Sequence, residues 1–185
     1  MLQQESAPDG VSGTARTQSK SASFTGWVLK RRERNFMAKT NEYYIDMAKT
    51  AADCDNLIAN AVRVGNTELA LLARKRKIVL QAAEHGATVQ VEVEAWNGIY
   101  AIEEYRRSQG KQHWRANYTR RAINNRNGDI VATVDDTVSR ADPTDGFQEM
   151  IDAGLEEFLW ERLVLRFPDE FSVRAVEQAR TRLRE

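Results

Sequence analysis

The sequence has few of the residues that build redox or metal sites: one cysteine, Cys54, and two histidines, His85 and His113. A single cysteine excludes an internal disulfide and argues against a zinc site built from thiolates. Cys54 lies within an apolar helical stripe with no base identifiable beside it, so we expect a small core residue rather than a nucleophile. We predict no catalytic residue, no metal and no cofactor.

Long apolar stretches are missing as well. No run approaches the ~20 residues that a membrane-spanning helix needs, and the N-terminus lacks the apolar core of a signal peptide. We therefore expect a soluble, cytoplasmic protein without a membrane partner. Glycine-rich phosphate loops, zinc-protease motifs and nucleophile elbows are absent too. An enzyme of unassigned chemistry is kept only as a second alternative.

The first 39 residues contain little that could form a core. Residues 1–23 are rich in Ser, Thr, Gln, Gly and Ala, so they cannot bury enough apolar surface to offset chain entropy, and we predict a disordered tail. Residues 24–39 form a basic and aromatic arm. Its candidate nucleic-acid contacts are Lys30, Arg31, Arg32 and Arg34, which would otherwise be a solvated helix start.

The remaining residues, 40–185, predict a single all-α domain of about seven short helices. Apolar residues recur at spacings of three and four, Gly65 and Gly86 end two of the segments, and Ser172 is well placed to cap the last helix. The short loop at Gly65 favours a helical hairpin, which a third helix follows up to residue 109. A basic helix and then acidic C-terminal helices occupy residues 110–185.

The sequence also predicts whether certain charged residues of the first three helices are buried or exposed. The four bases at positions 74–77 cover every direction around a helix axis, so one of them must lie near the core, where its stem can reach outward. The four glutamates of the third helix are expected on its exposed face, where carboxylates usually lie. They are Glu92, Glu94, Glu103 and Glu104.

The formal net charge of zero conceals a strong separation of sign. Residues 110–128 carry five bases and no acid, whereas residues 129–161 carry ten carboxylates and one base, Arg140. Trp114, Tyr118 and Ala122 are spaced by four and are expected to share one helical face. Arginine and asparagine side chains serve phosphate and base-edge contacts. The candidate contacts are Lys111, Arg115, Asn117, Arg120, Arg121, Asn124 and Arg126.

These patterns favour a small helical protein that binds nucleic acid, with DNA preferred over RNA, through residues 110–128. The competing interpretation is that these bases pair with the acidic segment of the same molecule. A further alternative is a helical interaction module whose acidic half binds a basic protein partner. Fold-level analogy cannot choose among these, because small helical domains host many functions.

Overall fold

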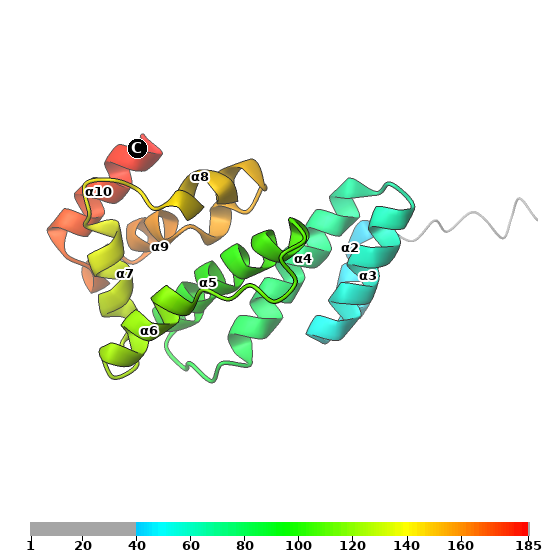
Figure 1. Ribbon diagram of the computed structural model, residues 1–185, viewed down its shortest axis with the longest axis horizontal. Coiled ribbons are helices and arrows are strands. Elements are labelled where there is room, and N and C mark those ends of the chain that lie inside the picture. Colours follow the sequence, from blue (N-terminus) through cyan, green and yellow to red (C-terminus); the bar gives the residue numbers. More distant parts are fainter. Residues whose placement is uncertain (1–39, 185) are drawn as a thin grey trace, which may run out of the picture. The chain divides into compact units, whose positions relative to one another are not determined.

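The computed structural model describes residues 40–184, so the predicted tail, residues 1–23, and the predicted arm, residues 24–39, lie outside the described residues. The described part contains nine α-helices, two short 3-10 helices and no strand, which confirms the all-α prediction (Figure 1). The elements are α2 (Asn41–Met47), α3 (Ala51–Arg63), α4 (Thr67–Ala83), α5 (Gln90–Ser108), α6 (Asn117–Asn125), α7 (Ile130–Val138), α8 (Asp145–Asp152), η1 (Glu156–Phe158), α9 (Trp160–Arg166), η2 (Pro168–Glu170) and α10 (Val173–Leu183).

Short polar side chains set where the helices begin. The Asn66, Asp129 and Ser172 side chains each accept a hydrogen bond from the backbone N–H three residues later, which satisfies a donor that the helix itself leaves free. A capping box between Thr50 and Asp53 starts α3. Because this box interrupts the segment that was expected to be one helix, residues 40–63 form two helices, α2 and α3.

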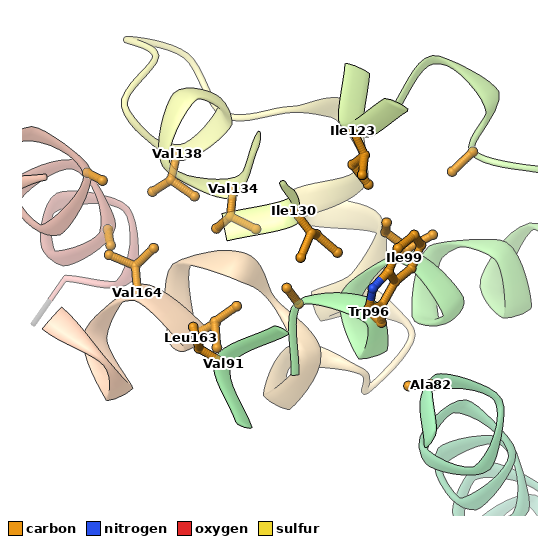
Figure 2. Packing of buried hydrophobic residues seen from close by; sticks show 14 of the residues in the cluster. Ala82, Val91, Trp96, Ile99, Ile123, Ile130, Val134, Val138, Leu163 and Val164 are labelled. Atoms are coloured by element: carbon orange, nitrogen blue, oxygen red, sulfur yellow. The ribbon is translucent and has the colours of Figure 1, made fainter. Parts of the chain in front are cut away.

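Helix α5 is the centre of the packing, since it contacts α4, α7, α8, α9 and η1. The larger of two apolar clusters around it joins α5 to α7, α9 and α10. Figure 2 shows Val134 and Val138 of α7 facing Leu163 and Val164 of α9 within that cluster. Cys54 is fully buried, as expected for a core residue, and burial raises the pKa of its thiol.

Gly98 in the middle of α5 allows the close approach of Trp160. The Trp160 indole Nε1 donates a hydrogen bond to the Ala95 carbonyl oxygen at 2.9 Å, so the ring lies directly on the α5 backbone. A Cβ atom at position 98 would lie 2.5 Å from Nε1 and 3.0 Å from the Phe158 carbonyl oxygen. Glycine costs a helix about 1 kcal/mol relative to alanine, and this contact explains its presence.

We expect Gly98→Ala to destabilise the protein by about 1–3 kcal/mol, because Trp160 and η1 must shift to admit the methyl group. Urea unfolding of the full chain would measure this loss. Gly146→Ala is the control, since its nearest neighbour is the flexible end of the Ile102 side chain at 3.2 Å and it should change stability much less. Equal or greater stability of Gly98→Ala would contradict the packing described here.

Candidate functional site

The basic segment, residues 110–128, is hydrogen-bonded to α5 through one buried carboxylate, that of Glu103. Its side chain is 2% exposed. Oε1 accepts a hydrogen bond from the Ala116 backbone N–H at 3.0 Å and another from Arg120 Nε at 2.8 Å. The expected solvent-exposed position of Glu103 was therefore wrong, because the basic segment itself covers this part of α5.

Arg120 contacts two aromatic rings as well as Glu103. Its guanidinium lies 5.4 Å from the ring centre of Trp96 and 5.3 Å from that of Tyr100, within cation–π range. Burial lowers the pKa of Arg120, but the hydrogen bond to Glu103 and the charge of that carboxylate, together with Tyr100, outweigh burial and raise the pKa. With 18% of its side chain exposed, Arg120 contributes chiefly to the fold. A contact between Arg120 and a ligand stays a prediction.

His85 belongs to the same aromatic group. Its ring stacks on Trp96 with 3.4 Å between the ring centres. Burial lowers the pKa of His85, and the nearby positive charge of Arg120 lowers it further. The neutral imidazole is therefore favoured at this helix end.

Arg115 is the second arginine on Glu103. Its Nε lies 3.5 Å from the same Oε1 atom, and 51% of its side chain is exposed. Two guanidinium groups thus share one carboxylate, which leaves a surplus of positive charge at this point. Lys111 and Arg121 are exposed, and neither has an ion-pair partner among residues 40–184. These three bases form the solvent-facing positive charge of the segment.

Arg126 instead meets the acidic segment, residues 129–161. Its Nη2 donates to Asp136 Oδ2 at 3.0 Å, and its Nη1 donates to the Ala132 carbonyl oxygen at 3.2 Å. The intramolecular interpretation thus describes Arg126, whereas Arg115 and Arg120 pair with α5. Asn117 and Asn124 are exposed at the two ends of α6. The arm residues Lys30, Arg31, Arg32 and Arg34 lie outside the described residues.

The predicted shared face of Trp114, Tyr118 and Ala122 was wrong. Helix α6 begins only at Asn117, because Ala116 has a non-helical backbone conformation while its N–H is bonded to Glu103. Trp114 therefore lies in the preceding loop, packed against the core with the Arg106 guanidinium 5.5 Å from its ring centre. Tyr118, in the first turn of α6, is 88% exposed.

A groove of about 710 Å³ runs beside the basic segment. Residues 113–119 line one side of it, including Arg115, Asn117 and Tyr118. Residues from α5, α7, α8, η1 and α9 and from the connecting loops complete the lining, among them Arg140 between α7 and α8 and Phe147 of α8. Sequence reasoning missed this groove, since its other lining residues come from both α5 and the acidic segment and form no motif.

The basic residues at positions 74–77 supply a second buried charge. Lys77 is the base that lies near the core, with its side chain 2% exposed, and its Nζ donates to Asp55 and, at 2.8 Å, to the buried Glu104. Arg107 also donates to Glu104. Glu104, like Glu103, was expected on the exposed face and is buried. Here the bases and acids are balanced, so the cluster ties α3, α4 and α5 together.

Comparisons with protein-family models, curated proteins and solved structures found no match to this chain. Among residues 40–184, no group of three or more His, Cys, Asp or Glu side chains could hold a metal ion. No helix in this described range is long and apolar enough to cross a membrane.

We expect Glu103→Gln to destabilise the protein by roughly 3 kcal/mol, because it removes the buried counter-charge of Arg120. Chemical unfolding followed by circular dichroism would measure the change. Asp136→Asn is the matched control, since Asp136 pairs with Arg126 at the surface and exposed pairs are worth at most about 1 kcal/mol. Similar losses for the two variants would refute the anchoring role of Glu103.

Proposed function

We propose that this protein binds nucleic acid through residues 110–128. The observation that carries the proposal is the surplus of positive charge around Glu103: Arg115 is half exposed, and Lys111 and Arg121 are exposed without acid partners among the described residues. Phosphate contacts of this kind supply most of the non-specific affinity for nucleic acid.

Two exposed asparagines lie on the same helix as one of these bases and could add polar contacts. Asn117 and Asn124 lie in the same helix as Arg121, and asparagine can pair with the edge of adenine. Base contacts of this type would add to the phosphate contacts of Lys111 and Arg115. The bases of the arm, residues 24–39, would add further electrostatic attraction for phosphate groups.

The alternative of an acidic half that binds a basic partner protein has less support, because most carboxylates of the acidic segment already have partners inside the molecule. Glu149, Glu157 and Glu161 pair with Arg106, Lys75 and Arg182. The others that accept hydrogen bonds or ion pairs are Asp129, Asp135, Asp136 and Asp152. Within the described residues this leaves only the side chains of Asp142, Asp145 and Glu156 unengaged.

Salt-dependent binding tests the proposal. Fluorescence anisotropy of labelled DNA and RNA with the full chain should show affinity that falls as salt rises, because phosphate contacts release counterions. Replacing both Lys111 and Arg121 by alanine should reduce the log–log slope on duplex DNA by about 1.8, from about 0.9 per phosphate contact. Stability should change by less than about 0.5 kcal/mol, since both side chains are exposed.

The matched control removes the same charge elsewhere. Arg174 and Arg180 are exposed on α10 without ion-pair partners in the described part of the chain, so their double alanine variant should leave the slope nearly unchanged. An equal decrease in both double variants would show that net charge alone matters. Absence of salt-sensitive binding by the unmodified protein would refute the proposed function.

A further inference from the structure

The exposed ring of Tyr118 has no role in the fold. It is the most exposed large apolar side chain in the described part of the chain, at 88%, and it makes no hydrogen bond or ring contact with the other described residues. Trp114, four residues earlier, is packed against the core. A tyrosine ring left in water at the edge of a groove is available to a ligand, because its flat apolar face is uncovered.

Two arginines lie near Tyr118. Arg121 follows it by three residues on α6 and therefore lies on a neighbouring part of the same helix surface. Arg115, half exposed, lines the same groove. Such an arrangement suits a ligand that combines a planar ring with negative charge.

A protein partner fits this surface less well. The core of a protein interface is a contiguous apolar patch, usually with several aromatic or aliphatic side chains. The other exposed large apolar side chains in the described range belong to different regions: residues 43–47, 62–64, Val79, Val89 and Val173. Tyr118 is the one exposed large apolar side chain among residues 110–170, and a single ring beside two arginines favours stacking on a base over docking of a protein.

A nucleic-acid base that stacks on Tyr118 must be unpaired. In a duplex both faces of each base are covered by its neighbours, so a protein ring can stack only on a base of a single strand or on one turned out of the helix. The groove beside Tyr118 measures about 710 Å³, within the range of pockets that hold small molecules. Its polar lining residues Asn117, Thr119 and Thr137 could meet the edge of such a base.

We propose that Tyr118 is a stacking platform for an unpaired base of single-stranded nucleic acid. The neighbouring phosphates lie along Arg115 and Arg121, and the base edge faces the groove. This inference rests on the proposed function and adds to it a preference for single strands over duplexes.

The test compares Tyr118→Ala with Tyr118→Phe in the full chain, using a labelled oligothymidine of about 16 nucleotides and a duplex of the same length. Tyr118→Ala should weaken binding to the single strand by about 5- to 150-fold, the loss that follows from removing one stacked base. The salt slope should stay unchanged, because no phosphate contact is lost. Tyr118→Phe should keep most of the affinity, since the ring remains.

The outcomes separate this inference from the proposed function. Equal losses on the single strand and the duplex would overturn the stacking role, as would equal losses for the alanine and phenylalanine variants. Unchanged affinity of Tyr118→Ala for both probes would also overturn the stacking role and would favour a protein partner for the exposed ring. Salt-dependent binding of the probes in that case would still support the proposed function. No salt-dependent binding of either probe by the unmodified protein would refute both.

Discussion

The arrangement of the basic segment depends on the hydrogen bonds of one carboxylate buried on the central helix. Glu103 binds a backbone N–H of the loop and the side chain of Arg120 on the following helix, and both groups stay in place because a buried carboxylate needs such partners. The start of α6, the position of Trp114 and the exposure of Tyr118 follow from this attachment. A local polar interaction thereby decides which side chains of residues 110–128 face the solvent.

The acidic segment has a different role from the one its composition indicates. Ten carboxylates in a short stretch are typical of a surface that meets a basic partner, yet most of them here cap helices or pair with bases of the same chain. Arg182 and Glu161, for example, form a pair that is almost fully buried between α10 and α9. Most carboxylates of this segment therefore already have hydrogen-bond or ion-pair partners inside the molecule.

Much of the fold could be predicted from local signals. Gly65, Gly86, Gly110 and Gly128 all have the left-handed conformation that ends helices, and Ser172 caps α10 as its position indicated. The break between α2 and α3 was missed because the apolar periodicity continues across it. Val173 precedes the buried Val176 and Ala179 at helical spacing but is 75% exposed, since a residue in the first turn of α10 extends beyond the packed surface.

The candidate site was less predictable, because it depends on contacts between distant segments. Glu103 follows Trp96 and Ile99 at helical spacings of seven and four, so its place in a buried stripe could be predicted, but its partners could not. Nothing in the sequence near Arg120 and Arg121 distinguishes the partly buried arginine from the exposed one. The groove is formed by residues from 98 to 161, so no short motif could reveal it.

Glu103 contacts its two arginines at different distances, and this difference affects how the surface can bind a phosphate. The shorter contact, to Arg120, fixes α6, whereas the longer one, at 3.5 Å, involves the half-exposed Arg115. An incoming phosphate can therefore replace Glu103 as the partner of Arg115 while Arg120 still holds the helix. The backbone that carries this surface is therefore already held in place before a ligand arrives, so binding has to order mainly the exposed side chains.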